Sequence, residues 1–571
     1  MKELHAGTGP RRARQRVRAV LPLVLVAACT ARTSIDAHSS TFAADGDGIQ
    51  QGTDAAYPVC ADVVVSSAGC LCEGARRTDG LCCADTWHAG GYCCAGVWQA
   101  TVCVFCTDGD GDSYEDALCG GDDCDDAAVA VYPGATDICG DGIDQDCSGG
   151  ALVCPSFTLD ALFAQAGVFV LDLGSVDNLN WTPQGSAVQP DGRIVLGGTG
   201  GSAANGSFTA LCLLENGTLD PTFGTAGIAT IDFGYDYEWL QAVRLQPDGK
   251  IVLAGEVSAT ASGGSLVGVA RLLADGSPDP TFATVGWRTV DLLAGADIVN
   301  GAVVLSDGRI RLCGQGWAVD PGSSDLVVYS LLADGSLETT FGSGGVLLID
   351  FFGGDEFGGS CQPGGGDSLL VPGTAWGATG FDAALARVLP DGTMDPAFDD
   401  GSTGLPGRAT LDISGQEEAC DAVVRQADGA ILCANGTSAA GVSDSLLIRF
   451  LPTGALDPTF GTGGFVVLDL GGNDFFAAIV VLPDGRIAAA GQRTNAAGDQ
   501  DFSLAVLTSA GALDTSVGTN IGQAGVFGFD VTPGFDDEAR SLILDPPGRL
   551  LLSGSSSDGN TNNFAALRLW L

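Results

Sequence analysis

A repeated segment with seven copies between residue 156 and Leu571 constrains the fold more than any other feature of this sequence. One half of the repeat reads LQPDGKIVLAG at 245–255. Clear copies of this half lie at 188–198, 304–314, 425–435, 481–491 and 544–554, with a degenerate copy at 360–373. The turn glycines of neighbouring clear copies are 56 to 63 residues apart. One interval is about twice as long, and the degenerate copy lies within it. Because a period of this length with several short strands per unit is typical of radial β-architectures, we expect an all-β radial fold.

Each repeat contains four strand-sized segments, which in the second copy are 240–246, 250–257, 265–273 and 286–292. Asp-Gly turns join the strands, because glycine supplies the positive φ that tight hairpins need. The Asp-Pro-Thr-Phe connection before the fourth strand ends in a phenylalanine that we expect to wedge between neighbouring blades. These residues are Phe163, Phe223, Phe282, Phe341, Phe398 and Phe460.

The two ends of the array predict a closed ring. The last copy stops after three strands, and the missing part of a unit appears at 156–174, which matches 455–471. An N-terminal strand would therefore complete the last blade and remove exposed sheet edges. The motif pair PDGKIVLAG and DGSLDPTFG resembles the delta-60 repeat of bacterial proteins over about 415 residues. This resemblance implies a β-propeller, here with seven blades over 156–571, and no particular activity.

The first 55 residues are typical of an export signal and a tether. Lys2 and five arginines precede an apolar run of about ten residues from Ala19 to Ala28, which is too short to span a bilayer. Val-Ala-Ala before Cys29 resembles the lipobox of bacterial lipoproteins, which implies cleavage of residues 1–28 and acylation of Cys29. Ordinary signal cleavage nearby is the alternative. Thr30 favours the outer membrane of a Gram-negative bacterium, and residues 29–55 are expected to be a flexible tether.

The net charge excludes some partners. Cleavage would remove six basic residues and Glu3, which changes the formal charge from −45 to −50. Such acidity opposes binding to nucleic acid or to anionic membrane surfaces and favours cations. We therefore expect membrane contact only through the lipid anchor.

Cysteine is concentrated before the repeats. Fourteen cysteines lie between Cys60 and Cys154, an even number that indicates a framework of up to seven disulfides in an exported protein. A zinc site is less favoured, because the spacing is irregular and His88 is the only nearby histidine. We assign 56–106 to a cysteine-rich segment. The repeats hold five further cysteines, of which Cys420 and Cys433 flank one hairpin and are candidates to pair, and at least one is left over.

Residues 107–150 form an acidic segment with carboxylates spaced two apart, which can converge on one hard cation. The twelfth position of the first candidate loop is Cys119 rather than Glu, and Ser113 replaces the usual glycine, so a regular EF-hand is not expected. Tyr114 would contribute a backbone carbonyl. The candidate ligands are Asp108, Asp110, Asp112, Asp116, Asp122, Asp123, Asp125 and Asp126, with a second loop at Asp141, Asp144 and Asp146.

The order DxDGD, DDCDD, VYPGAT and CGDGIDQDCSG resembles the MopE-type metal-binding motif of bacterial surface and secreted proteins over about 45 residues. That family name is associated with copper, which prefers imidazole, thiolate or thioether ligands. This segment offers oxygen and cysteines that we expect to be oxidised, so we predict Ca²⁺. A disulfide-held acidic linker without a tight site is the alternative.

Every connection between blades carries carboxylates, which in a propeller would lie on one face around the channel mouth. We hypothesise an acidic rim that attracts divalent cations or a cationic ligand. The alternative is that these residues cap the local backbone. They are Asp177, Asp236, Glu238, Asp297, Asp355, Glu356, Glu417, Glu418, Asp474, Asp536, Asp537 and Glu538.

Two functions remain open at this stage. The first is a surface-anchored lipoprotein with a calcium-binding module and a propeller that binds a glycan or protein ligand or serves as a scaffold. The second is an exported propeller enzyme that acts on polysaccharide or peptide through paired carboxylates. No histidine lies between 156 and 571, which excludes histidine-based acid–base chemistry there and favours a non-enzyme. The irregular fourth copy, with a glycine-rich stretch at 353–366 and Trp376, is where a catalytic pair would be sought.

Overall fold

The computed structural model describes 110, 112–114, 122–125, 127–173, 185–202, 205–258, 264–293, 295–317, 323–401, 403–413, 415–439, 441–546 and 548–571, and the backbone of six strands between 70 and 99. The chain forms two compact units. The first is Met1–Asp137 with Asp144–Gly150, and the second is Ile138–Ile143 with Ala151–Leu571. Among the described residues, no helix has the length and apolarity needed to cross a membrane.

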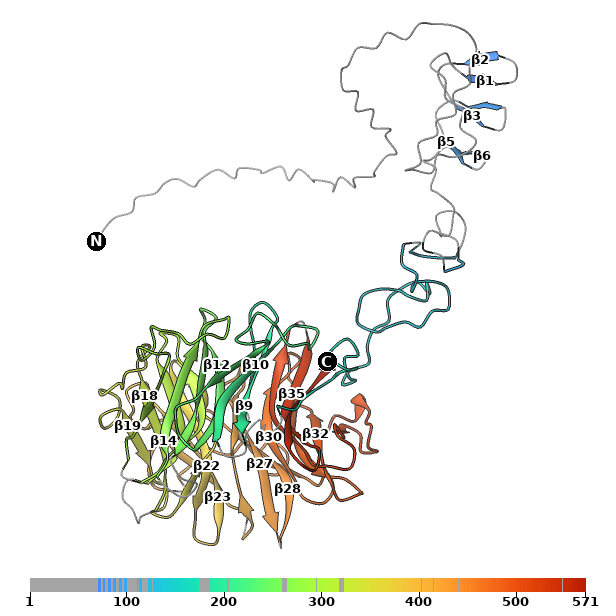
Figure 1. Ribbon diagram of the computed structural model, residues 1–571. Coiled ribbons are helices and arrows are strands. Elements are labelled where there is room, and N and C mark those ends of the chain that lie inside the picture. The colour runs from blue at the N-terminus through green and yellow to red at the C-terminus, as the bar shows by residue number, and fades with distance from the viewer. Residues whose placement is uncertain are drawn as a thin grey trace, which may run out of the picture. The chain divides into compact units, whose positions relative to one another are not determined.

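The second unit is a seven-bladed β-propeller in which each blade is an antiparallel sheet (Figure 1). Blade 1 contains β8 (Ser186–Val188), β9 (Ile194–Ser202), β10 (Asn205–Leu213) and β11 (Ile228–Ile231). Blade 2 contains β12 (Tyr237–Leu245), β13 (Ile251–Ser258), β14 (Leu266–Leu272) and β15 (Trp287–Val290). Blade 3 contains β16 (Asp297–Val304), β17 (Ile310–Gly316), β18 (Asp325–Leu331) and β19 (Val346–Ile349).

The fourth and fifth blades have a divided first strand, so each contains five strands. Blade 4 contains β20 (Glu356–Gly358), β21 (Gln362–Gly365), β22 (Ser368–Trp376), β23 (Phe381–Val388) and β24 (Arg408–Leu411). Blade 5 contains β25 (Glu417–Glu418), β26 (Ala422–Arg425), β27 (Ile431–Ala439), β28 (Val442–Phe450) and β29 (Phe465–Leu468). The degenerate copy at 360–373 thus folds as β21 and most of β22.

The last two sheets complete the ring. Blade 6 contains β30 (Asp474–Val481), β31 (Ile487–Thr494), β32 (Gln500–Leu507) and β33 (Val526–Phe529), with a short 3₁₀ helix at Thr515–Val517. Blade 7 contains β34 (Asp537–Asp545), β35 (Arg549–Ser557) and β36 (Asn562–Trp570), and its outer strand is β7 (Val168–Leu171) from the other end of the repeat array. β36 and β7 are antiparallel, with Phe564 opposite Leu171.

A β-bulge in the first strand of the blade requires the glycine that ends the IVLAG motif. The register between β12 and β13 shifts between Leu240 and Ala242, and a Cβ on Gly255 would lie 1.9 Å from the carbonyl oxygen of Trp239. Equivalent shifts occur in blades 3, 6 and 7. Because the bulge brings that carbonyl against the neighbouring strand, only glycine fits there.

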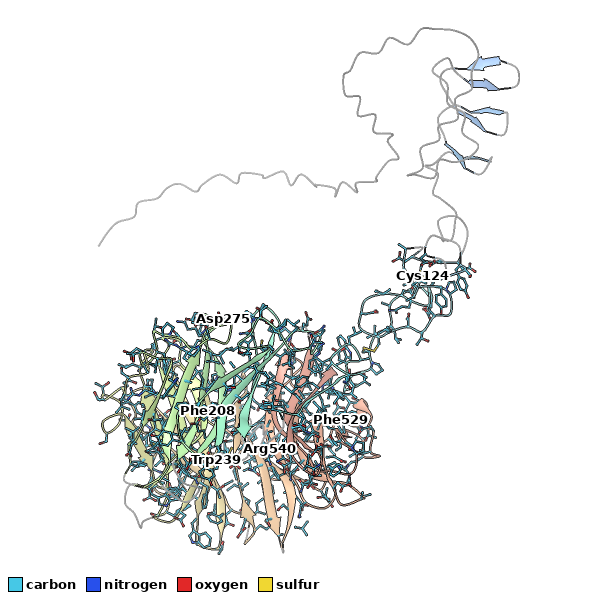
Figure 2. The ribbon with its side chains drawn as sticks, viewed as in Figure 1. Cys124, Phe208, Trp239, Asp275, Phe529 and Arg540 are labelled. Carbon is cyan, nitrogen blue, oxygen red and sulfur yellow. A yellow bond between two sulfur atoms is a disulfide. The ribbon has the colours of Figure 1, made fainter. Side chains whose placement is uncertain are left out.

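Apolar side chains fill the spaces between neighbouring blades. Phe208 of blade 1, for example, belongs to a buried cluster with Leu240 and Val243 of blade 2 (Figure 2). The six predicted wedge phenylalanines are all at most 2% exposed. Each phenylalanine ring packs closely against a turn glycine of the next blade. At Gly335, for example, an added Cβ would lie only 2.7 Å from the Phe282 ring. The predicted wedge is confirmed.

In most blades the guanidinium of a largely buried arginine lies over the ring of the wedge phenylalanine. Arg271 forms an ion pair with Asp279 at 2.7 Å, and its guanidinium lies 4.8 Å from the centre of the Phe282 ring. Its Nη1 also donates to the carbonyl of Ala333 in blade 3, at 2.5 Å. The same contact to the next blade recurs from Arg311, Arg387 and Arg449. In blade 7, Arg568 binds Asp160 at 2.8 Å and the carbonyl of Glu215 in blade 1 at 2.5 Å.

Disulfides strengthen the irregular blades. Cys420 is bonded to Cys433 within blade 5, the pair that the sequence suggested. Cys313 of blade 3 is bonded to Cys361 of blade 4, a pair that the sequence did not suggest. Cys212 is the free, buried cysteine of the described part of the chain, and burial raises the pKa of its thiol to about 12. Cys139 is bonded to Cys154, which ties residues 138–143 to the start of the propeller.

The first unit has little regular structure. Its backbone forms three small hairpins, from β1 (Cys70–Cys72) with β2 (Ala75–Arg77), β3 (Leu81–Cys83) with β4 (Thr86–His88), and β5 (Tyr92–Cys94) with β6 (Val97–Gln99). Cys124 and Cys147 are disulfide-bonded in the acidic segment. The remaining cysteines of the predicted framework lie outside the described side chains.

Removing an arginine of a buried ion pair should destabilise the protein much more than removing a carboxylate of an exposed ion pair. Arg271→Met should lower the free energy of unfolding by about 3 kcal/mol, because Asp279 stays buried and keeps Lys250, at 3.4 Å, as its only charged partner among the described residues, beside the hydrogen bonds from Thr281. Asp191→Asn should change it by less than about 1 kcal/mol, because Asp191 is half exposed in its pair with Arg193. Urea unfolding followed by tryptophan fluorescence measures both, and equal effects would contradict the role assigned to Arg271.

Candidate functional site

Three carboxylates of the acidic segment converge in the first unit. One oxygen each of Asp110, Asp112 and Asp123 lies within 4.8 Å of the others. Asp123 is fully buried, and the Oδ2 atoms of Asp112 and Asp123 are buried without a hydrogen-bond partner. A buried carboxylate oxygen is costly unless a hydrogen bond or a cation satisfies it. This geometry therefore fits a bound cation.

The other oxygens of these carboxylates hold the loop in shape. Asp110 Oδ1 accepts the backbone N–H of Asp112, Asp112 Oδ1 accepts that of Tyr114, and Asp123 Oδ1 accepts that of Asp125. The Cys124–Cys147 disulfide and a stack between Tyr114 and Tyr132, 5.2 Å apart, bring the separate turns together. Each aspartate thus uses one oxygen to order the backbone and directs the other toward the cluster.

A second carboxylate cluster contains Asp137, Asp144 and Asp146, also within 4.8 Å. Asp144 and Asp146 were predicted ligands, whereas Asp137 was not, because it lies outside the spaced-aspartate pattern. Asp137 accepts the backbone N–H of Asp146, and Asp144 and Asp146 both accept that of Ser148. Hydrogen bonds from Ser148 hold the pKa of Asp146 below its ordinary value.

The other predicted ligands have different positions. Asp141 accepts the N–H of Ile143 and belongs to the second unit, while Asp125 and Asp122 are exposed. Asp108, Asp116 and Asp126 lie outside the described residues.

The carboxylates predicted to form a rim on the propeller fall into two sets. Asp236, Asp355, Glu417 and Asp536 are exposed, and Glu538 is partly exposed. Glu238, Asp297, Glu356, Glu418, Asp474 and Asp537 are at most 1% exposed. Asp177 lies outside the described residues.

The buried set lies at the start of the first strand of blades 2 to 7 and caps the connection that precedes it. Glu238 Oε1 accepts the N–H groups of Phe233 and Tyr235, and Asp537 Oδ2 accepts those of Val531 and Thr532. Burial raises the pKa of Glu238 and Glu418 to about 7 and that of Glu356 to about 8. These residues therefore order the backbone of the connections and place carboxylates near the face of the propeller on which the connections lie.

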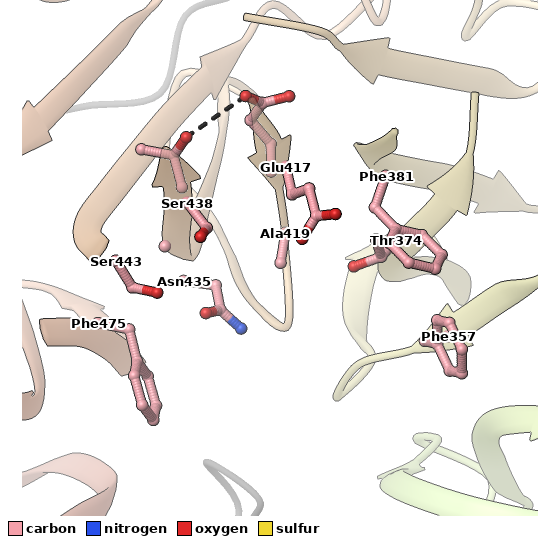
Figure 3. A pocket seen from close by; sticks show the side chains of 12 residues that line it. Phe357, Thr374, Phe381, Glu417, Ala419, Asn435, Ser438, Ser443 and Phe475 are labelled. Atoms are coloured by element: carbon pink, nitrogen blue, oxygen red, sulfur yellow. Dashed lines mark hydrogen bonds between the residues drawn. The ribbon is translucent and has the colours of Figure 1, made fainter. Parts of the chain in front are cut away.

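A cavity of about 240 Å³ lies between blades 4 and 5, in the region that the irregular repeat singled out (Figure 3). Phe357, Phe381 and Phe475 supply apolar walls, while Glu417 and Glu418 supply carboxylates. Phe381 also contacts the half-exposed Trp376, with ring centres 4.7 Å apart. This combination of aromatic and acidic groups suits a polar ligand with apolar faces.

Sequence reasoning missed a second layer of carboxylates at the blade junctions. Asp325 and Asp350 lie with Glu356, and Asp382 and Asp412 lie with Glu418, each group within 4.8 Å. The available signal was an aspartate that directly follows the fourth strand in every repeat, in LLID, ATLD and VVLD. Its partner on the third strand of the same blade lies 25 positions earlier for Asp350 and 30 positions earlier for Asp412, so the pattern alone did not reveal the contact.

Together, the fold and these clusters define a β-propeller protein with a separate acidic metal-binding module. Five segments match the family model described as a domain of unknown function (DUF5122) beta-propeller, at 189–223, 246–282, 367–398, 426–460 and 482–516. Residues 123–151 match the MopE model for a metal-binding motif, whose name refers to copper. The chain thus carries repeats of this β-propeller family and a MopE-type motif.

No curated protein matches the chain. Solved structures with a similar fold include a protein of unknown function from Dyadobacter fermentans, 13% identical, covering 59% of this chain and 96% of its own, with a TM-score of 0.39. The polysaccharide lyase Uly1 is 10% identical, with coverages of 69% and 91% and a TM-score of 0.39. Drosophila Semaphorin 2a is 8% identical, with coverages of 73% and 76% and a TM-score of 0.42. At these scores the neighbours do not bear on activity.

The buried rim predicts an unusual pH dependence. Because the pKa of Glu238 is about 7 in the folded protein and 4.5 ordinarily, the folded state binds more protons between these values, and stability should fall as pH rises from about 4.5 to 7. Glu238→Gln should remove part of this loss and be more stable than wild type at pH 8 but not at pH 4.5. Urea unfolding at both pH values measures this. Asp236→Asn, at an exposed neighbour, serves as the control, and a Glu238→Gln effect that is the same at both values would contradict the prediction.

Proposed function

We propose that the protein is a bacterial surface lipoprotein in which a calcium-binding acidic module links a lipid anchor at Cys29 to a β-propeller that acts as a binding or structural scaffold. The observation that carries this proposal is the cluster of Asp110, Asp112 and Asp123, in which buried oxygens of Asp112 and Asp123 lack hydrogen-bond partners. A cation at this position would join the turns that the Cys124–Cys147 disulfide already holds.

The donor set favours calcium over copper. Asp123 also lies near Cys124 and Cys147, but these two cysteines form a disulfide and offer no thiolate. The cluster that remains consists of oxygen ligands, which suit Ca²⁺, whereas Cu(II) prefers imidazole nitrogen and Cu(I) prefers sulfur. The residues of this chain would order the loop and supply charge, and the ion would supply a rigid cross-link.

Calcium binding has a direct test. Asp112→Asn together with Asp123→Asn in the full chain should weaken Ca²⁺ binding at least tenfold at one site by isothermal titration calorimetry, because the charge of the buried oxygens is lost. Asp141→Asn, at a carboxylate that caps Ile143, should leave that site unchanged. Equal Ca²⁺ affinity in the double variant, or tighter binding of Cu²⁺ than of Ca²⁺ by wild type, would contradict the proposal.

The lipid anchor rests on the basic and apolar leader before Cys29. Cys29→Ala should prevent incorporation of labelled palmitate and release the protein from the membrane fraction into the soluble fraction of a Gram-negative host. Replacement of the free thiol in the propeller, Cys212→Ala, should leave both unchanged. Palmitate incorporation that survives Cys29→Ala would exclude this anchor.

For the propeller we propose a glycan or protein ligand at the cavity between blades 4 and 5. Phe357 and Trp376 are 40% and 48% exposed, and they offer aromatic faces of the kind that stack on sugar rings or apolar side chains. Glu417 and Asp355 are exposed beside them and would accept hydrogen bonds from hydroxyl or amide groups.

One observation favours the enzyme alternative. Burial raises the pKa of Glu418 to about 7, which suits a general acid, and the adjacent Glu417 lines the same cavity. A propeller enzyme acting on polysaccharide or peptide through these carboxylates would release product from a panel of glycans and peptides, and Glu418→Gln would abolish it. A scaffold would bind members of the panel without cleaving them.

A further inference from the structure

The junction between blades 4 and 5 brings Asp382 together with two carboxylates that lie 30 or more residues later in the sequence, Asp412 and Glu418. Asp382 is the second residue of β23, Asp412 directly follows β24, and Glu418 ends β25. In an antiparallel blade the third strand begins, the fourth strand ends and the next blade's first strand begins at the same face of the propeller. One oxygen of each carboxylate consequently lies within 4.8 Å of the other two.

Two of these carboxylates are buried and incompletely satisfied. Asp382 is 7% exposed and Glu418 is 1% exposed, and Asp382 Oδ1 and Glu418 Oε2 have no hydrogen-bond partner. The charged group that raises the pKa of Asp382, after burial itself, is Asp412, which has the same sign. A buried group of like charges without a counter-charge is strongly unfavourable unless it is neutralised.

The local backbone makes room for this arrangement. A Cβ on Gly377 would lie 2.2 Å from Asp382 Oδ2, so the turn between β22 and β23 can pass this carboxylate only with glycine there. The N–H of Gly377 donates to the carbonyl of Gly380 at 2.8 Å, which closes the turn over the cluster. Asp412 is exposed and leaves a path from solvent.

We propose that Asp382, Asp412 and Glu418 bind a divalent cation of the calcium class at the junction of blades 4 and 5. The cluster offers carboxylate oxygens from three separate elements, which suits Ca²⁺ because it accepts flexible all-oxygen geometry, whereas Mg²⁺ demands a near-ideal octahedron. The ligands are oxygens, and the nearby Cys420 is held in its disulfide with Cys433. This site is separate from the acidic module and does not depend on the function proposed for that module.

The equivalent positions at other junctions have partners from the protein itself. Asp501, which corresponds to Asp382 in blade 6, forms an ion pair with Arg493 at 3.1 Å. At the junction of blades 5 and 6, Asp474 accepts hydrogen bonds from Ser445 and Leu470 through both oxygens.

At the junction of blades 3 and 4, Asp325, Asp350 and Glu356 also converge, but Arg408 donates to the carbonyl of Asp350 at 2.8 Å and interacts with both Asp350 and Glu356. At the junction of blades 4 and 5, in contrast, Asp382 Oδ1 and Glu418 Oε2 have no hydrogen-bond donor among the described residues, and no basic group of these residues acts on either carboxylate. A cation there would neutralise the cluster, join two blades and place positive charge in the wall of the 240 Å³ cavity that Glu418 lines.

Terbium luminescence tests this site. The parent protein is the full chain with Asp112→Asn, Asp123→Asn, Asp144→Asn and Asp146→Asn, so that both carboxylate clusters of the acidic module are weakened. Tb³⁺ replaces Ca²⁺ at oxygen sites, and Trp376, in contact with Phe381 beside Asp382, should sensitise its emission. We expect a Tb³⁺ signal that Ca²⁺ displaces and that Trp376→Phe reduces.

Asp412→Asn should weaken Tb³⁺ binding at least tenfold while the far-ultraviolet circular dichroism stays that of the parent, because Asp412 is exposed. Glu418→Gln should have the same effect, and Asp501→Asn should leave binding unchanged. The proposal is overturned if the parent gives no Ca²⁺-displaceable signal, or if Asp412→Asn binds Tb³⁺ as tightly as the parent does.

Discussion

The contact between a buried arginine and the turn of the next blade is the interaction on which the propeller depends. Arg271 illustrates it, because one guanidinium pairs with Asp279 in its own blade, covers Phe282 and donates to Ala333 in the following blade. Five donors in a planar group allow these contacts at once. In blade 7, Arg568 makes the same contact to blade 1, so this contact joins five of the seven pairs of neighbouring blades.

The connections between blades lie on the opposite face of the propeller. There the connections between blades are acidic, and buried carboxylates such as Glu238 and Asp474 order them by accepting backbone N–H groups. In a chain with a formal net charge of −45, such groups stay tolerable only where hydrogen bonds, arginines or cations neutralise them. The same requirement governs Asp112 and Asp123 in the acidic module, so one physical constraint accounts for both candidate metal sites.

Much of the fold was predictable because its determinants are local. The Asp-Gly turns, the wedge phenylalanines and the Cys420–Cys433 pair all follow from residues close together in sequence. The bulge that requires Gly255 was not predictable, because it depends on where the carbonyl of Trp239 in the neighbouring strand lies. In the acidic module, Asp110 and Asp112, which the spacing predicted as ligands, lie in one cluster. Which later aspartate joins them depends on the Cys124–Cys147 bond, whose connectivity no spacing reveals.

The sequence by itself determined the seven-bladed propeller and located the acidic module, since a repeat of turns and strands recurs in register and aspartates spaced two apart mark a loop that can bind a cation. Only the tertiary structure decided which carboxylates meet. Asp382, Asp412 and Glu418 are separated along the chain and come within 4.8 Å because antiparallel strands return to the same face of the ring. It also divided the predicted rim into exposed residues and buried caps, because burial depends on the packing of one blade against the next.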